Sequence, residues 1–341
     1  MAGTTGRANG ARETGEHPDE LANWRTGGAL VAVEDSGERR ERIMALEIRP
    51  LTPILGAEVV GADLGNLSDD QFAEIFEAFT AHSVIFLRDQ PALTPEQHFA
   101  FAERFGEVHI HPFARLGDRP TGGERQGLLH IHTTSESRVA AGNRWHSDVS
   151  CDEEPPQASI LQLHQIPPVG GDTLFASMYA AYDALSDRMK RMLDGLTARH
   201  SGEESYRKLF QAKTVDPTAT WPEVDHPIVR RHVDSGRAAL YIDREFTQSI
   251  NDLPKQEAKS LLEFLFEHCE RVNFQCRFRW SENAIAVWDN RAVMHHAMWD
   301  YWPHERKGHR ISVKGEKPEM WRLDYDRAPT DLAANTVRLT A

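Results

Sequence analysis

Residues 271–280 carry the clearest secondary-structure signal in the chain, a regular alternation of apolar and polar side chains. One set of alternate positions is apolar and comprises Val272, Phe274, Cys276, Phe278 and Trp280. The other set is polar and comprises Asn273, Gln275, Arg277 and Arg279. Because successive side chains of a strand point to opposite faces, the pattern predicts a strand with one face in a core. The aromatic positions are therefore expected to belong to the core of a sheet.

Further strand signals are scattered widely along the sequence. Short apolar segments cover residues 83–88, 158–164, 172–176, 284–288 and 309–313. Two consecutive prolines and two consecutive glycines lie between the second and third of these segments and predict a turn. A mostly helical stretch, which includes residues 255–268, separates the early strands from the late ones. This arrangement predicts a β-sandwich or barrel decorated with helices.

Two helices are expected near the start of the folded region. In residues 69–79 the apolar side chains are spaced for one face of a helix. The second helix is expected to begin at Thr94, with Pro95 in its first turn and Gln97 three residues after the cap. It is expected to end near Gly106.

The domain organisation follows from composition. Residues 1–43 are rich in Gly, Arg and Glu and have no sustained hydrophobic period, so we expect a disordered extension. Met44 and the apolar residues after it suggest a natural beginning for the folded part. With no long linker and no internal repeat, residues 44–325 are expected to form one α+β domain, followed by a tail over residues 326–341.

Charge and hydropathy exclude several classes of protein. The formal net charge is −13, which disfavours binding to nucleic acid or to anionic lipid. The sequence shows neither an apolar run long enough to cross a bilayer nor a secretory signal, so the cytoplasm is the expected location. The 3 cysteines form no C-x-x-C pair and are expected to be reduced thiols.

The sharpest chemical feature is the segment Asn143-Arg144-Trp145-His146-Ser147-Asp148. On an extended chain, residues i and i+2 point to the same side, so His146 and Asp148 can present a nitrogen and an oxygen to one ion. One more histidine would complete the facial set of non-haem iron(II) oxygenases, which leaves three metal positions open. A short apolar strand near the C-terminal end leads into a loop with His295, which can supply that third ligand.

The chain resembles the taurine dioxygenase family, which includes the alkylsulfatase and 2,4-dichlorophenoxyacetate dioxygenases. The resemblance extends from about Leu46 to Pro318, and four segments carry it in order, namely residues 105–112, 145–149, 170–174 and 288–291. It implies a double-stranded β-helix (jelly-roll) core with flanking and inserted helices. It also implies iron(II) as cofactor, 2-oxoglutarate and dioxygen as co-substrates, and succinate and carbon dioxide as products. A homo-oligomer, dimer or tetramer, is expected on the same ground.

The resemblance also assigns residues to the metal and to the co-substrate. The spacing from Asn290 matches the family's metal ligand to His295, so we expect His146, Asp148 and His295 to bind iron. Its neighbour His296 is expected either to support a metal ligand without touching the ion or to be an ordinary polar residue. Thr173 and Arg306 are expected to bind the far carboxylate of 2-oxoglutarate, a task that suits the planar, always charged guanidinium.

Substrate-binding residues follow from the same resemblance. Arg310, four residues after Arg306 on an expected strand, matches an arginine that reaches a substrate anion and also touches 2-oxoglutarate. His111 and the backbone of Val149 match positions that bind a sulfonate, and Asn143 is the asparagine nearest to a further substrate position. These residues imply a small anionic substrate, namely a sulfonate, a sulfate ester or a carboxylate.

Two departures from the family pattern argue against taurine itself. Ala114 stands where taurine dioxygenase has a tyrosine, and Gly142 aligns with an expected asparagine. A larger or less polar anion is therefore the expected substrate. By contrast, His130 and His132 fall in a polar stretch and are expected to face solvent from a loop.

Two other classes of function use parts of the same pattern. A zinc hydrolase could use the same three ligands with an activated water, but it would not need the pair Thr173 and Arg306. A non-catalytic barrel that binds small molecules could keep the fold without all three ligands. Within the family, the iron centre could also perform a desaturation or another oxidation. The sequence shows no P-loop and no glycine-rich dinucleotide signature.

Overall fold

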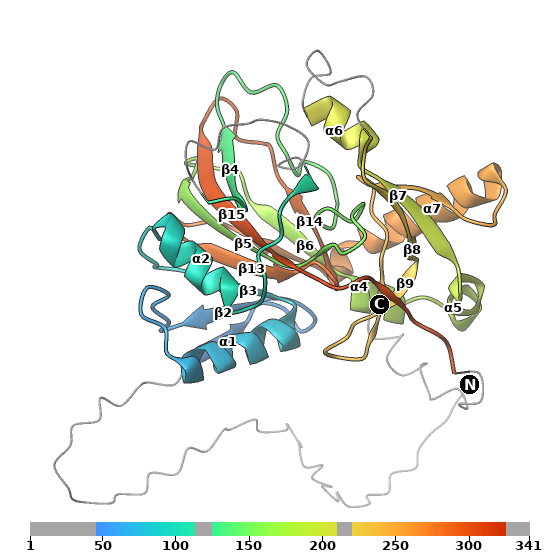
Figure 1. Cartoon of the computed structure of the whole chain (residues 1–341), viewed down its shortest axis with the longest axis horizontal. Helices are drawn as coiled ribbons and strands as arrows, with labels where there is room; N and C mark the ends of the chain where they lie inside the picture. The colour runs from blue at the N-terminus through green and yellow to red at the C-terminus, as the bar shows by residue number, and fades with distance from the viewer. Residues whose placement is uncertain (1–45, 113–124, 210–219, 325–341) are drawn as a thin grey trace, which may run out of the picture. The chain divides into compact units, whose positions relative to one another are not determined.

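The computed structural model describes residues 46–112, 125–209 and 220–324 (Figure 1). Its largest sheet joins strands from distant parts of the sequence, in the order β1-β2-β3-β13-β5-β15-β4. These strands are β1 (Glu47–Pro50), β2 (Ala57–Val60), β3 (Val84–Leu87), β13 (Ile285–Asp289), β5 (Pro156–Gln165), β15 (Arg306–Lys314) and β4 (Leu128–Thr133). Among the described strands of this sheet, only the pair β2 and β3 is parallel.

A second, three-stranded sheet has the order β12-β6-β14 and packs against the first. It consists of β12 (Gln275–Phe278), β6 (Thr173–Ser177) and β14 (Val293–Ala297). Aromatic side chains fill the space between the two sheets. The ring of Phe86 stacks on Phe278 at a centroid distance of 3.9 Å and meets Phe175 edge-on at 5.5 Å. The two layers confirm the expected mixed fold, in which strands predominate over helices.

Helices α1 (Asp69–His82) and α2 (Pro95–Glu103) cover the other face of the large sheet (Figure 1). Their apolar sides, including Ile75, Phe79 and Phe99, pack on strand residues such as Ile160. Both helices begin with a capping box, in which Ser68 or Thr94 accepts a hydrogen bond from the third residue of the helix. The two predicted helix starts are thus confirmed, although α2 ends at Glu103, before Gly106.

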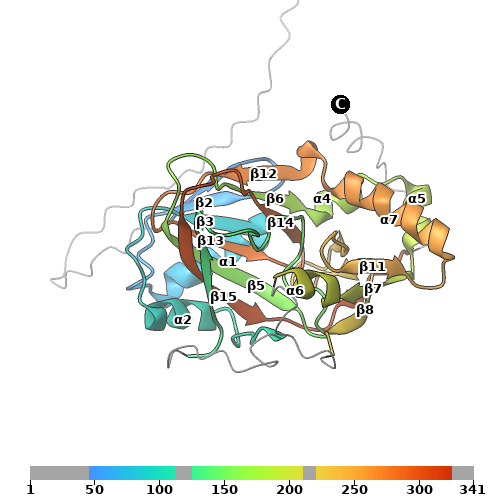
Figure 2. The same ribbon diagram turned by 90° about the horizontal axis from the view of Figure 1, so that it is seen from above.

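The remaining helices and strands lie beside the two sheets. They are α4 (Met178–Asp183), α5 (Asp187–Leu193), β7 (Thr197–Ser201), α6 (Glu203–Leu209), β8 (Glu223–Pro227), β9 (Val229–Arg231), β10 (Ala238–Leu240), β11 (Thr247–Ile250), α7 (Lys255–Cys269) and β16 (Glu319–Met320). Several of them, including α4, α7 and β10, share a further apolar cluster. Strands β11, β7 and β8 form one small sheet, and β10, β9 and β16 form another. Helix α7 lies along the first of these sheets (Figure 2).

The prediction of one strand over residues 271–280 is wrong in its first half. Residues Val272–Phe274 form a 3₁₀ turn, and the side chain of Val272 is 81% exposed. The chain leaves α7 at Cys269 and reaches the sheet only at Gln275, where it pairs with β6. The alternation is confirmed from residue 275 onward, because Cys276, Phe278 and Trp280 are buried.

Two further expectations concern the ends and the loops of the chain. The expected extension over residues 1–43 and the tail over residues 326–341 lie outside the described residues. The stretch with His130 and His132 is strand β4 and not a loop, although both side chains are exposed, as expected. Among the described residues, no helix has both the length and the apolar character needed to cross a bilayer.

Candidate metal centre and its surroundings

Two backbone hydrogen bonds bring the expected metal ligands together. The backbone N–H of His146 donates to the carbonyl of His295 at 3.0 Å, and the N–H of His295 donates to the carbonyl of His146 at 2.9 Å. This antiparallel bridge places the segment before β5 beside strand β14. Asp148 follows two residues after His146, so its carboxylate points to the same place.

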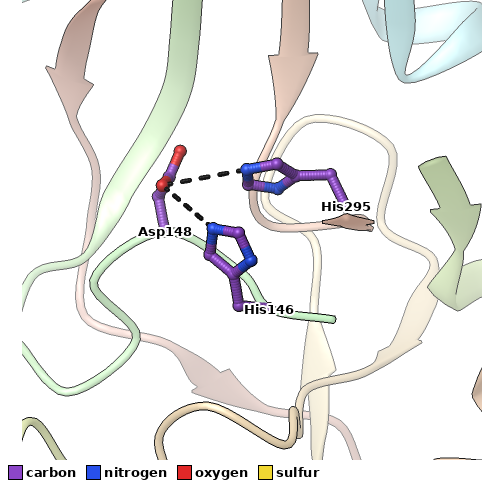
Figure 3. A group of neighbouring side chains, drawn as sticks. All are labelled: His146, Asp148 and His295. Carbon is purple, nitrogen blue, oxygen red and sulfur yellow. Dashed lines mark ion pairs between the residues drawn. The ribbon is translucent and has the colours of Figure 1, made fainter. Parts of the chain in front are cut away.

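The three side chains converge as predicted (Figure 3). Nε2 of His146 lies 3.7 Å from Oδ1 of Asp148, and Nε2 of His295 lies 3.9 Å from the same oxygen. One potential ligand atom from each residue lies within 4.8 Å of the others, and all three residues are buried. Two imidazole nitrogens and one carboxylate oxygen on one side are the donor set that iron(II) accepts in oxygenases.

The imidazole of His146 is already oriented to bind a metal. Its Nδ1–H donates to the carbonyl oxygen of Arg144 at 2.8 Å, which leaves the lone pair of Nε2 directed toward Asp148. His295 packs against the ring of Trp288 at a centroid distance of 4.7 Å. Burial first, and then the neighbouring His146, lower the pKa of His295 well below its usual value, so its ring is neutral. A neutral imidazole is the form that binds a metal.

Asp148 is held in its ionised form by its neighbours. Burial alone would raise the pKa of this carboxyl, but the guanidinium of Arg310 first, and then the hydrogen bond from Ser159, hold it well below the usual range. Nη1 of Arg310 donates to Oδ1 at 2.5 Å, and the hydroxyl of Ser159 donates to Oδ2 at 2.8 Å. The carboxylate of Asp148 is thus charged and fixed in orientation, as a metal ligand would need.

Asn290 and Ser159 form hydrogen bonds that fix the position of the Asp148 carboxylate. The sequence did not predict this role for either residue. The amide Nδ2 of Asn290 donates to Ser159 Oγ at 3.1 Å, and its Oδ1 accepts from the indole of Trp288 at 2.9 Å and from the backbone of Asp148 at 3.3 Å. The hydroxyl of Ser147 donates to the carbonyl of Asn290 at 2.7 Å. The available signal was the segment Trp288-Asp289-Asn290-Arg291, which carries the family resemblance but had no assigned role.

We expect Ser159→Ala to weaken iron(II) binding by roughly 10- to 100-fold, the usual cost of losing a group that orients a metal ligand. The substitution removes the hydrogen bond to Asp148 Oδ2 and leaves Arg310 as the main constraint on the carboxylate. Competition with a calibrated iron chelator measures the affinity. Ser312→Ala is the matched control, because its hydroxyl contacts Ser159 at 3.0 Å, whereas the hydrogen bond to Asp148 Oδ2 comes from Ser159. Equal iron affinities in Ser159→Ala and wild type would contradict the supporting role.

Arg306 is a buried guanidinium that lacks acceptors for two of its nitrogens. Its Nε and Nη2 find no hydrogen-bond partner among the described residues, and its side chain lies over the ring of Trp280 at 5.7 Å. Burial lowers the pKa of Arg306 from its usual value. A buried charge without a partner is costly, so this site fits an anionic ligand such as a carboxylate.

Thr173 completes the side of the site that the sequence assigned to 2-oxoglutarate. Its Oγ1 accepts a hydrogen bond from the indole of Trp280 at 3.0 Å, which leaves its own hydroxyl proton to donate elsewhere. Trp280 thereby links Thr173 and Arg306, and it is a residue that the sequence placed only in the core. Tyr301 lies nearby, with its hydroxyl 2.6 Å from Oγ1 of Thr133.

The turn before Thr173 depends on two glycines. Gly170 and Gly171 have φ angles of +82° and +72°, a region that favours glycine. A Cβ on Gly170 would lie only 2.6 Å from Oδ1 of Asp300. The same oxygen accepts the backbone N–H of Gly171 at 2.8 Å. Asp300 therefore stabilises the turn that precedes Thr173.

The residues that were expected to bind the substrate differ in their contacts and in their exposure to solvent. Arg310 reaches Asp148, and His111 is half-buried with its ring 5.7 Å from that of Tyr206. Burial first, and then Arg310, lower the pKa of His111 to about 3. Asn143 is exposed, and its Oδ1 accepts a hydrogen bond from Nε2 of His296 at 3.2 Å. The expected departure at Ala114 lies outside the described residues.

Val149 follows the expected metal ligand Asp148 and belongs to an apolar cluster. Its φ angle is +49°, an uncommon conformation for a β-branched residue, and it is found here directly after Asp148. Its side chain packs in a cluster with Cys151, Tyr206, Phe246 and the partly buried Trp221. The sequence did not assign the aromatic members of this cluster, because they lie far from the motif along the chain.

A serine, a histidine and an aspartate also meet beside the metal segment. Ser150 donates to Oδ2 of Asp243 at 2.7 Å, and its Oγ lies 3.0 Å from Nδ1 of His200. Since the serine proton points to the carboxylate and all three residues are buried, the group does not present a hydrolytic nucleophile. It ties the metal segment to β7 and to the turn before β11.

Comparison with known proteins identifies the family. The family model described as "Taurine catabolism dioxygenase TauD, TfdA family" matches residues 47–312. The chain belongs to this family. This match confirms the expected family. It also confirms the expected enzyme class and the expected cofactors, which are those of the TauD, TfdA family.

Individual relatives agree with this assignment. An alpha-ketoglutarate-dependent sulfate ester dioxygenase of Pseudomonas putida is 34% identical, with 81% of this chain and 91% of that protein covered. An alpha-ketoglutarate-dependent 2,4-dichlorophenoxyacetate dioxygenase of Cupriavidus pinatubonensis is 34% identical, with 74% and 92% covered. The crystal structure of a taurine dioxygenase from Burkholderia xenovorans superposes with a TM-score of 0.68 at 32% identity, and covers 86% of this chain and 100% of its own.

Proposed function

We propose that this protein is an iron(II)- and 2-oxoglutarate-dependent dioxygenase that oxidises a C–H bond of a small anionic organic substrate. One observation supports this best. A buried set of two imidazoles and a carboxylate occurs together with the buried guanidinium of Arg306, two of whose nitrogens have no acceptor among the described residues. A zinc hydrolase needs only the first of these features. A small-molecule-binding barrel needs neither.

His146, Asp148 and His295 would hold the iron, which supplies the redox chemistry for dioxygen when bound. Arg306 and the hydroxyl of Thr173 would bind the far carboxylate of 2-oxoglutarate. Arg310 would keep Asp148 ionised and present its remaining N–H groups to the substrate anion or to 2-oxoglutarate. The oxidation consumes dioxygen and 2-oxoglutarate and yields succinate, carbon dioxide and the oxidised substrate, by hydroxylation, cleavage or desaturation.

The fold and the cellular setting complete the proposal. The two packed sheets would form a double-stranded β-helix, carried by one domain over residues 44–325. The enzyme would work in the cytoplasm as a homo-oligomer, a dimer or a tetramer, without nucleic acid or membrane partners. The formal net charge of −13 supports the last point.

The substrate would be a sulfonate, a sulfate ester or a carboxylate with an apolar body. Arg310 and His111 supply the polar contacts for the anion, with Asn143 and the Val149 backbone as further expected contacts. Relatives are named for a sulfate ester and for 2,4-dichlorophenoxyacetate. The cluster of Val149, Tyr206 and Phe246 offers apolar surface close to Asp148, which suits the apolar body of such a substrate.

Anaerobic titration of the iron(II)-loaded protein with 2-oxoglutarate tests the reaction class. We expect the visible charge-transfer band of the iron chelate to form in wild type, to be absent in Asp148→Ala and to require far more 2-oxoglutarate in Arg306→Met. Lys307→Met, at the exposed next position of β15, is the matched control and should titrate like wild type. A folded, iron-loaded wild type without the band would favour the zinc hydrolase or the binding barrel.

A panel of substrates read out by succinate then tests the substrate class. Alkyl sulfates, alkyl sulfonates and aryloxy acids should be turned over faster than taurine. Turnover of taurine with no response to the longer anions would overturn the proposed apolar substrate.

A further inference from the structure

Three histidines lie on the face of the large sheet that points away from the metal centre. Strands β4, β15 and β5 are neighbours in the large sheet (Figure 1). They contribute His130, His309 and His164. His309 is directly opposite His130 in the register of β15 and β4. Arg310 points inward to Asp148, so its neighbour His309 must point to the opposite face.

The imidazoles approach one another closely. Nε2 of His164 lies 3.2 Å from Nδ1 of His309. The ring of His309 is 4.8 Å from that of His164 and 4.7 Å from that of His130, centroid to centroid. Two nitrogens bound tetrahedrally to one zinc ion at the usual bond length are about 3.3–3.4 Å apart. The first pair therefore already has the separation of two ligands.

The tautomer of His164 also suits a metal ligand. Its Nδ1 lies 3.3 Å from Oδ1 of Asn283, an acceptor, so the ring proton is on Nδ1 and the lone pair of Nε2 points to His309. Metal ligands are commonly oriented by such a bond on the other ring nitrogen. Without an ion, the proton on Nδ1 of His309 would occupy the space between the two rings. A bound cation would replace that proton.

We propose that His164, His309 and His130 form a second transition-metal site, which takes zinc or a similar divalent ion such as nickel or copper. Imidazole donors suit these ions. His164 and His309 are half-buried and form the prearranged pair, while the exposed His130 turns its side chain to supply the third nitrogen. The ion would join three adjacent strands, of which β15 carries Arg306 and Arg310 on its other face.

Zinc titration of the full-length protein by calorimetry tests this site separately from the iron site. Wild type should bind two equivalents, one at the expected iron ligands and one at the histidines of the outer face. His164→Ala and His309→Ala should each lower the affinity of one equivalent by at least ~100-fold, since even a lost supporting group costs ~10- to 100-fold. His130→Ala should lower it by at least ~10-fold, and His304→Ala, an exposed histidine elsewhere, should change nothing.

Asp148→Ala supplies the complementary experiment, because it disables the proposed iron site. This variant should keep one equivalent of zinc, and adding His164→Gln should remove it. Zinc should raise the melting temperature of Asp148→Ala but not that of the double variant. A single equivalent in wild type that disappears in Asp148→Ala would overturn the second site. A second equivalent of zinc that still binds to both His164→Ala and His309→Ala would also overturn the second site. Neither result bears on the iron-dependent reaction.

Discussion

Replacing Arg306 with methionine is expected to stabilise the protein in the absence of 2-oxoglutarate while destroying its use of that co-substrate. Arg306 is buried, and its Nε and Nη2 have no acceptor among the described residues. Keeping such a charge out of water without a partner costs free energy that methionine does not incur. We expect the free energy of unfolding of the apoprotein to rise by about 1–3 kcal/mol.

The same substitution should raise the KM for 2-oxoglutarate by at least ~30-fold, because truncating one partner of a buried charge pair costs about 2–5 kcal/mol of binding. Urea unfolding of the apoprotein and steady-state kinetics measure the two effects. Lys307→Met should change neither by much, since that side chain is exposed. An Arg306→Met variant that is less stable than wild type would show that the guanidinium has a structural partner, and the proposed carboxylate site would have to be abandoned.

Asp148→Ala is expected to destabilise the apoprotein by about 3–5 kcal/mol, the usual cost of removing one partner of a buried ion pair. The guanidinium of Arg310 would lose its acceptor at 2.5 Å and remain without its charge partner. The double variant Asp148→Ala/Arg310→Met should recover most of the loss, because it removes the charge left unpaired. If the double variant is no more stable than Asp148→Ala, the two residues are not coupled through charge.

The effect of Asp148→Ala should also depend on pH in a defined direction. The folded-state pKa of Asp148 is held well below its usual value, chiefly by Arg310 against the opposing effect of burial. Its contribution to stability is therefore fully present above the unfolded-state pKa of about 4. The contribution is lost as the pH falls through the folded-state value. Urea unfolding of wild type and variant at a series of acidic pH values should show the difference shrinking only in that range.

The metal segment could be found from sequence because its chemistry is local. His146 and Asp148 are two residues apart on extended chain, so their side chains share one direction whatever the rest of the fold does. The helix start at Thr94 was equally accessible, since a capping box is complete within four residues. The resemblance to a family then supplied His295, Thr173 and Arg306, which no local rule connects to the first two.

Other features depend on which strands become neighbours. The alternation over residues 271–280 predicts too long a strand, because only Gln275–Phe278 find a partner in β6. The missing acceptors around Arg306 and the support of Asp148 by Asn290 and Ser159 arise from contacts between segments distant in sequence. His130, His309 and His164 look unrelated along the chain and meet only through the register of three strands. Periodicity shows which face of a strand a residue occupies, whereas only the paired sheet shows which residues share that face.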